Sequence, residues 1–220
     1  MATYKQGILG GFSGRIGNVI GTFWKGRQVM RIRAATVNDA NTVRQQEQRL
    51  KFKLMVSFIN AHKALVNWGF GAYDRTMSAV NIAISMNLRT AITGIFPNLT
   101  IDLPKVILSK GTLPGFEDNI VTSTLPNTIS LDWLDNAGTS NAFGTDNLMV
   151  SVVDDASREV LLFPNAAKRT DEEVMITLPA LWTARQVTVY TFFVNEDGLS
   201  TVSDPSQVSD TERTLGLVVA

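Results

Sequence analysis

Few residues of this 220-residue chain have the type and spacing that enzyme chemistry needs. Cysteine is absent, which excludes thiolate nucleophiles, disulfides and cysteine-ligated metal or iron–sulfur sites. His62 is the single histidine, so multi-histidine metal sites are excluded as well. Because His62 stands beside Lys63 in a helical pattern, we expect it on a polar helix face and not in catalysis.

The glycine-rich start resembles two known functional loops in part but lacks residues that each requires. Residues 21–28 have the glycine spacing of a phosphate loop, but Arg27 stands where lysine is required and Gln28 where a hydroxyl would hold magnesium. Residues 11–14 read Gly-Phe-Ser-Gly, one residue short of the GxSxG nucleophile elbow. No GxGxxG dinucleotide pattern is present either. We therefore expect no nucleotide and no other cofactor.

Two pairs of adjacent acids, Asp154-Asp155 and Glu172-Glu173, could in principle supply a general acid and a base. Each pair falls at an apparent turn of a β-rich region, where acidic side chains favour turn formation and solubility. Nothing in the sequence brings the two pairs together. The sequence thus predicts no catalytic residue and no metal ligand, and the protein is expected not to be an enzyme.

Charge is divided unevenly along the chain. Residues 1–95 hold 13 basic and three acidic residues, a net charge of +10, whereas residues 96–220 hold seven basic and 17 acidic residues, a net charge of −10. Such opposition favours an anionic partner for the first half, either nucleic acid or a complementary protein surface that another copy could supply. We favour the protein surface. The candidate interface residues are Phe12, Arg15, Phe23, Trp24, Arg27, Arg31 and Arg33.

These residues need a β-hairpin to position them. Residues 18–33 alternate β-branched, aromatic and basic residues around the turn Lys25-Gly26. Strand periodicity puts the four residues Arg27, Val29, Arg31 and Arg33 on one face. Gln28, Met30 and Ile32 then lie on the other.

Two helices are predicted next. The first begins near Thr42, which forms a capping box with Gln45, runs through Val66 and ends at Gly69 and Gly71. The second runs from about Arg75 to Thr93, with Asp74 as its cap and Gly94 as its stop. Residues 97–114 are predicted to be an extended connection with a strand at 105–109.

The remaining residues predict a β-sandwich, because short β-rich runs recur between turn residues. ISLDW at 129–133 and VTVYTFFVNEDGLST at 187–201 resemble the Trp-bearing early strand and the Tyr-bearing late strand of a fibronectin type III or immunoglobulin-like fold. That fold implies no single function. A glycan-binding or hydrolase role would rest only on this fold, Trp133, Trp182 and the acid pairs, and Trp133 alternates as a core residue.

The predicted class is therefore α+β. The predicted parts are a Gly-rich β segment and hairpin (1–40), a helical hairpin (41–96), a connecting segment (97–115), an immunoglobulin/fibronectin-III-like sandwich (116–208) and a carboxy-terminal tail (209–220).

KQGILGGFSGRIGNVIGTFWKGRQVMR at 5–31 resembles the amino-terminal signature of an uncharacterised family of Bacteroidetes proteins. Residues 87–115, ISLDW and LPALW at 178–182 resemble the same family. The resemblance brings no activity and no functional residue with it.

The sequence thus predicts a non-enzymatic structural or interaction protein that self-assembles into a filament, a tube or a phage-like particle component. Homo-oligomers and other proteins of an assembly are the expected partners, and nucleic-acid binding through the basic half is the alternative. A signal-peptide pattern and an apolar run of about 20 residues are both lacking. We expect no membrane span, and a cytoplasmic protein or a particle assembled in the cytoplasm.

Overall fold

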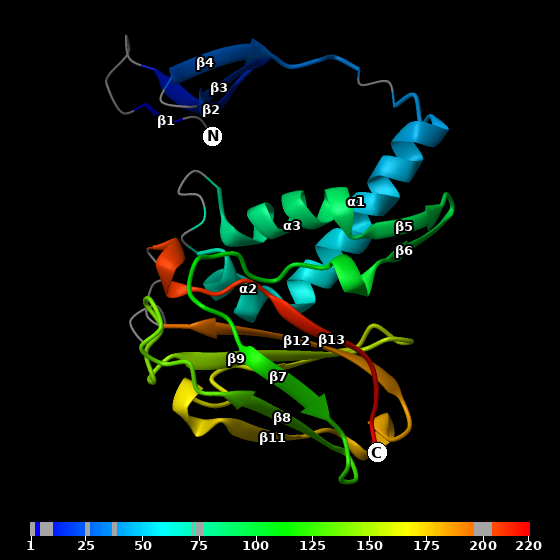
Figure 1. Cartoon of the computed structure of the whole chain (residues 1–220). Coiled ribbons are helices and arrows are strands. Elements are labelled where there is room, and N and C mark those ends of the chain that lie inside the picture. The colour runs from blue at the N-terminus through cyan, green and yellow to red at the C-terminus, as the bar shows by residue number, and fades with distance from the viewer. Residues whose placement is uncertain are drawn as a thin grey trace. The chain divides into compact units, whose positions relative to one another are not determined.

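The computed structural model divides into two compact units, Met1–Thr42 and Val43–Ala220 (Figure 1). It describes residues 3–4, 11–24, 27–36, 39–71, 73, 77–195 and 204–220.

The amino-terminal unit is a four-stranded antiparallel sheet in the order β1-β2-β3-β4. Its strands are β1 Thr3–Tyr4, β2 Phe12–Ile16, β3 Val19–Trp24 and β4 Arg27–Ile32. The predicted hairpin is confirmed, because β3 and β4 pair from Val19↔Ile32 to Trp24↔Arg27. Its turn, Lys25-Gly26, lies outside the described residues. A second two-residue turn joins β2 to β3, and Gly17 has the positive φ of +58° that such turns favour.

The first predicted helix is two helices, α1 Val43–Ala61 and α2 Lys63–Gly69. The helix is interrupted at His62, whose backbone N–H donates to the carbonyl of Ile59 instead of that of Phe58. Gly69 ends α2 as expected. A Cβ there would lie 2.2 Å from the carbonyl oxygen of Leu108, so glycine permits this close approach.

The second predicted helix is shorter than expected. It is α3 Ala79–Thr90, and Ser78 caps it by accepting a hydrogen bond from the backbone N–H of Asn81. Asp74, the predicted cap, lies outside the described residues. The predicted final turn is instead a hairpin of β5 Ile92–Ile95 and β6 Asn98–Ile101, in which Gly94 has a φ of +97°.

The prediction of a strand at 105–109 is wrong. The backbone of this segment is instead held by hydrogen bonds to side chains from other parts of the chain. Asn87 bonds with both the N–H and the carbonyl of Ile107, at 2.7 Å each. The N–H groups of Leu108 and Ser109 both donate to the hydroxyl of Thr211. Side chains therefore satisfy a backbone that the sequence pattern assigned to a sheet.

The rest of the chain forms two antiparallel sheets, in the orders β11-β8-β7 and β10-β9-β12-β13, which is the arrangement of an immunoglobulin/fibronectin-III-like sandwich. The strands are β7 Glu117–Thr122, β8 Thr128–Leu134, β9 Asn147–Asp154, β10 Val160–Phe163, β11 Glu173–Thr177, β12 Gln186–Val194 and β13 Glu212–Val218. The predicted α+β class is confirmed.

The sandwich extends to the end of the chain, because β13 pairs with β12 where a tail was predicted at 209–220. The register shifts between Val187 and Val189, opposite Leu215 and Gly216. Gly216 has a φ of +62°, which suits a bulge. This bulge interrupts the alternation that would have marked the strand in the sequence.

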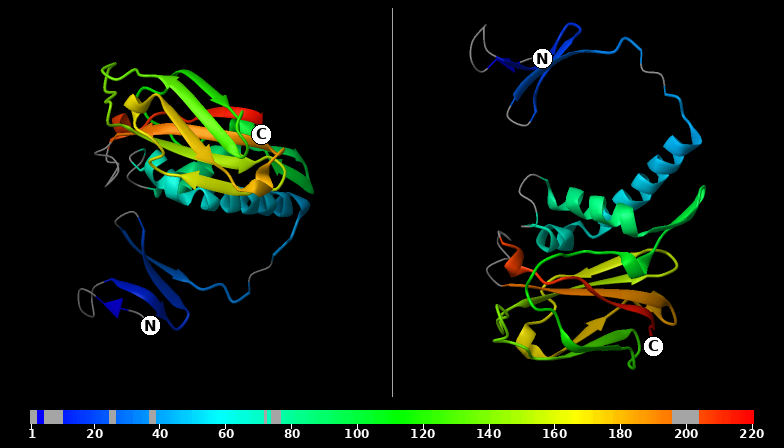
Figure 2. Two further views of the ribbon diagram at one scale, coloured as in Figure 1. Left: turned by 90° about the horizontal axis from the view of Figure 1, so that it is seen from below. Right: turned by 45° about the horizontal axis from the view of Figure 1, so that its top comes forward.

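The larger unit has three layers: helices, the four-stranded sheet and the three-stranded sheet (Figures 1 and 2). One core joins α1, α2 and α3 to Met149, Val153, Tyr190 and Phe192 of the four-stranded sheet. A second core fills the space between the sheets. Strands β9 and β12 are therefore buried on both faces. The sequence predicted the helical hairpin and the sandwich as separate parts. In the structure they pack against each other and share a hydrophobic core.

Candidate interaction surface

The amino-terminal sheet has one apolar face, defined by strand register. Paired residues of an antiparallel sheet share a face. The pairs Ile16↔Val19, Val19↔Ile32 and Gly21↔Met30 therefore continue one face across β2, β3 and β4. We call it the apolar face, and its large side chains are Phe12, Ile16, Val19, Phe23, Met30 and Ile32.

The apolar face is open to solvent. Phe23, Met30 and Ile32 expose 64%, 71% and 80% of their surface, and Ile16 exposes 42%. Among the described residues, neither hydrophobic core includes a side chain of residues 1–42. Within the sheet Phe12 packs over Gly21, where a Cβ would lie 2.7 Å from the ring. A single sheet with one apolar face needs a further layer packed on that face to be stable.

The opposite face, which we call the basic face, carries Arg15, Arg27 and Arg31. All three are exposed. Arg15 donates from Nε to the carbonyl of Gly17 at 2.8 Å. Within the described part of the chain, no ion pair neutralises any of the three. Their charges are therefore available to an anionic partner.

The predicted interface residues divide between the two faces. Phe12 and Phe23 lie on the apolar face, and Arg15, Arg27 and Arg31 on the basic face. Arg33 lies one residue beyond β4, where its backbone N–H donates to the carbonyl of Asn18. Trp24 pairs with Arg27 through the backbone, and its side chain lies outside the described residues. Sequence reasoning missed the exposed Met30 and Ile32 as interface candidates, although it placed both opposite the arginines.

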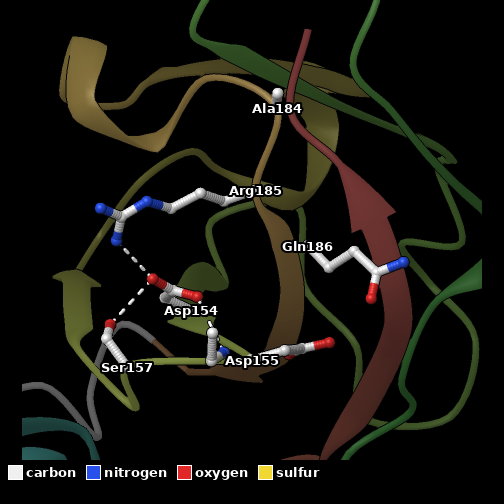
Figure 3. A pocket seen from close by; sticks show the side chains of 7 residues that line it. Asp154, Asp155, Ser157, Ala184, Arg185 and Gln186 are labelled. Atoms are coloured by element: carbon white, nitrogen blue, oxygen red, sulfur yellow. Dashed lines mark hydrogen bonds and ion pairs between the residues drawn. The ribbon is translucent and has the colours of Figure 1, made fainter.

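A hollow of about 740 Å³ lies at the β9–β10 turn, around the buried carboxylate of Asp154 (Figure 3). Asp154 accepts hydrogen bonds from the N–H of Ala156, the hydroxyl of Ser157 and the guanidinium of Arg185. Burial raises the pKa of this carboxyl, but these bonds outweigh it and lower the pKa. The Asp154 carboxylate thus stabilises the β9–β10 turn, which is the role predicted for the pair Asp154-Asp155.

His62 is buried, not on the polar helix face that the sequence predicted. Its Nδ1 donates to the carbonyl of Phe58 at 2.8 Å, and the two rings lie 4.4 Å apart. Burial lowers its pKa to about 4, so the imidazole is neutral at pH 7. The Phe58–His62 spacing of four residues on an otherwise apolar stripe is the signal that could have placed it in the core.

Arg169 is fully buried in the sandwich, which the sequence did not indicate. It donates to the carboxylate of Asp146 at 3.1 Å and to the carbonyls of Pro114 and Gly115. Its guanidinium lies 3.9 Å from the centre of the Phe193 ring. These contacts fasten the start of the sandwich to its interior.

Within the described ranges, no group of three or more His, Asp or Glu side chains is placed to hold a metal ion. No helix among the described residues is long and apolar enough to cross a bilayer.

Comparison with known proteins identifies a family. A family described as "Family of unknown function (DUF6266)" matches residues 11–207. No curated protein matches the chain. The solution structure of the fn3 domain of the human collagen alpha-1(XX) chain is similar to 49% of this chain, over 87% of its own length, with 11% identity and a TM-score of 0.32. The fn3 domain of human contactin 1 is similar to 51% of this chain, over 84% of its own length, with 8% identity and a TM-score of 0.31.

Proposed function

The chain belongs to the family of unknown function DUF6266, and we propose that it is a non-enzymatic structural subunit that assembles with copies of itself through residues 1–42. The observation that carries this proposal is the open apolar face of the amino-terminal sheet. A fibronectin-III-like sandwich is an architecture that interaction and structural modules use, and it would project from such an assembly.

The apolar face gives the assembly its driving force. Fully covering a Phe, Ile or Met side chain is worth about 1.5 to 3 kcal/mol. Phe23, Met30 and Ile32 each expose more than half of their surface. Contiguous exposed apolar residues of this kind mark interaction surfaces in proteins.

A second copy is the occupant that this face fits best. Two identical apolar faces are self-complementary, as a two-fold interface requires, and two sheets packed face to face lie about 10 Å apart. Arg27 and Arg31 lie on the opposite face, so pairing the apolar faces does not bring these charges together. Two such sheets would form the closed sandwich that one sheet cannot form alone.

Mass measurement by light scattering coupled to size exclusion tests the proposal. At about 1 M salt the Debye length falls to about 3 Å, so contacts between charged surfaces are suppressed while apolar contacts persist. We expect a species of two 24.1 kDa chains under these conditions. The double substitution Phe23→Ser/Ile32→Ser should reduce it to a single chain.

Ile95→Ser is the matched control, because Ile95 is also an exposed isoleucine, with 86% of its surface accessible, in the β5–β6 hairpin. It should leave the pair intact. A wild-type chain that is monomeric at high salt, or a Phe23→Ser/Ile32→Ser variant that still pairs, would overturn the proposal.

Nucleic-acid binding is the second candidate, favoured by the three arginines of the basic face, which form no ion pair among the described residues. It predicts purified protein with excess absorbance at 260 nm, about the nucleic-acid maximum, and an affinity that falls linearly with the logarithm of salt concentration. The net charge of −10 on residues 96–220 of the same chain favours a protein partner, since it offers the arginines a complementary surface.

A further inference from the structure

We propose that the outer face of the sheet β11-β8-β7 is the docking site for the basic face of the amino-terminal sheet of a second copy. This inference rests on the proposed function and adds a second, head-to-tail contact to the pairing of apolar faces. The outer face is defined by the residues that point away from the sandwich core, Glu117, Ile120, Thr122, Thr128, Ser130, Asp132, Leu134, Glu173, Met175 and Thr177.

The outer face is the one broad sheet surface that the described part of the larger unit leaves open. The helices cover the far side of the four-stranded sheet, and β11-β8-β7 lie on the side away from the helices (Figures 1 and 2). Ile120 and Met175 each expose 58% of their surface. A partner that covers these two side chains would remove apolar surface from water.

The outer face also carries a pair of acids in an unfavourable arrangement. Strand register places Glu173 directly opposite Asp132, and Ile120 lies opposite Asp132 on its other side. Like charges directly opposite each other in a sheet are destabilising. Among the described residues, no lysine or arginine forms an ion pair with either acid. A cationic partner would relieve this repulsion.

The shape of the outer face suits an arginine side chain. A hollow of about 200 Å³ is lined by Glu173 and Met175 together with Leu125, Thr122, Thr124, Thr128 and Ser130. An arginine that enters it can lay its methylene stem along Met175 and direct its guanidinium to Glu173. Arg27 and Arg31 share one face of β4, and Glu173 and Met175 share one face of β11, so each strand presents its two side chains to the same side.

Contact between the basic face of one copy and the outer face of the next joins two different surfaces. Such a heterologous contact produces a ring or an open filament, depending on whether the rotation closes. The pairing of apolar faces would then connect neighbouring rows. The two contacts differ in salt dependence, because only the head-to-tail contact is between opposite charges.

Charge exchange between the two surfaces tests this inference. One variant, Arg27→Glu/Arg31→Glu, reverses the basic face, and another, Asp132→Lys/Glu173→Lys, reverses the outer face. At low salt we expect wild-type protein to form species larger than a pair and each variant alone to stop at the pair. The apparent dissociation constant of the head-to-tail contact should rise at least about 100-fold, because each variant sets like charges against each other.

An equimolar mixture of the two variants should restore the wild-type size distribution. Each reversed face then meets a complementary face on the other chain, which docking within a single chain could not achieve. The control Glu47→Lys/Glu159→Lys makes the same change in net charge elsewhere in the larger unit and should assemble as wild type. Circular dichroism melts establish that every variant is folded, and Asp132→Asn/Glu173→Gln provides a neutral form that should weaken large species less than the reversal.

Large species formed by the Asp132→Lys/Glu173→Lys variant alone would overturn this inference, as would a mixture that remains at the size of the pair. Neither result affects the apolar pairing, which the measurement at high salt reports separately. Failure of the proposed function is recognised by a wild-type monomer at high salt. Failure of the docking site is recognised when the mixture of the two charge-reversed variants forms dimers but no larger species.

Discussion

His62 is a neutral histidine that the fold holds in an apolar environment. Its ring lies between Phe58, at 4.4 Å, and Tyr190, at 6.3 Å, and the hydroxyl of Tyr190 donates to the carbonyl of Leu103. The Nε2 atom of His62 is buried and has no hydrogen-bond partner among the described residues. A proton on this atom would therefore place an uncompensated charge in the core between the helices and the sandwich.

This arrangement makes folding stability depend on pH. The pKa of His62 is lowered from 6.5 to about 4, so between these values the unfolded chain binds a proton that the folded chain does not. The free energy of unfolding should fall by about 3 kcal/mol as pH drops from 6.5 to 4, and the slope that His62 contributes should fade within about one pH unit above 6.5. Urea unfolding at a series of pH values measures this slope.

His62→Leu provides the control, because it removes the titrating group and the unpartnered Nε2 atom and retains an apolar side chain. Its loss of stability in the same acid range should be smaller than that of wild type by the same amount. Equal slopes in the two proteins would contradict the assignment of this pH dependence to His62.

At the scale of elements, the sandwich is fastened to its preceding segment by Arg169. The Asp146 carboxylate and the Arg169 guanidinium are both fully buried, and burial raises the pKa of Asp146 and lowers that of Arg169. A buried ion pair of this kind is strongly destabilising when one partner is removed, because the other charge stays uncompensated.

Arg169→Met should accordingly lower the free energy of unfolding by about 3 to 5 kcal/mol. The double variant Arg169→Met/Asp146→Asn should be more stable than this single variant, since no buried charge is left. Denaturant midpoints give both values. Lys110→Met is the comparison at the surface: it breaks the exposed pair with Asp210 and should cost less than about 1 kcal/mol. A single variant that is as stable as the double would contradict the argument.

The sequence predicted the elements whose patterns are local. The β3–β4 hairpin and the alternation within β8 and β12 follow from residue order alone, and so do the opposite faces of Arg27 and Met30. Elements that depend on distant partners were missed or wrong. The segment around Ile107 is held by hydrogen bonds to Asn87 and Thr211, and β13 is interrupted by the Gly216 bulge. Neither structure could therefore be predicted from the residues of the segment alone.

The same limit applies to the candidate site. Arginine and aromatic residues at alternate positions led to the prediction of an interface at residues 12–33, which stays a prediction. The complementary outer face was not predicted, because Asp132 and Glu173 lie 41 positions apart and become neighbours only through the pairing of β8 with β11. Composition indicated a negatively charged half, but only strand register locates a surface within it.

At the scale of the whole molecule, the two units differ in what they need for folding. Residues 43–220 contain both hydrophobic cores and the buried Arg169 network. Residues 1–42 carry six basic residues and one acidic residue, a net charge of +5, and a sheet whose apolar face is open. The larger unit thus buries enough apolar surface to be stable by itself. The smaller unit has an apolar and a charged surface but buries few side chains.

A chain reduced to residues 43–220 should therefore fold by itself. We expect its thermal midpoint to lie within a few degrees of the midpoint for the same unit in the intact chain, since about 1 kcal/mol shifts the midpoint of a domain of this size by roughly 2 to 4 °C. It should also be monomeric at low and at high salt, because it retains the outer face but lacks both faces of the amino-terminal sheet. Calorimetry and light scattering measure the two properties on the same sample. A shortened chain that melts far below the intact protein would show that residues 1–42 complete the fold, and one that still forms pairs at high salt would place the pairing surface in the larger unit.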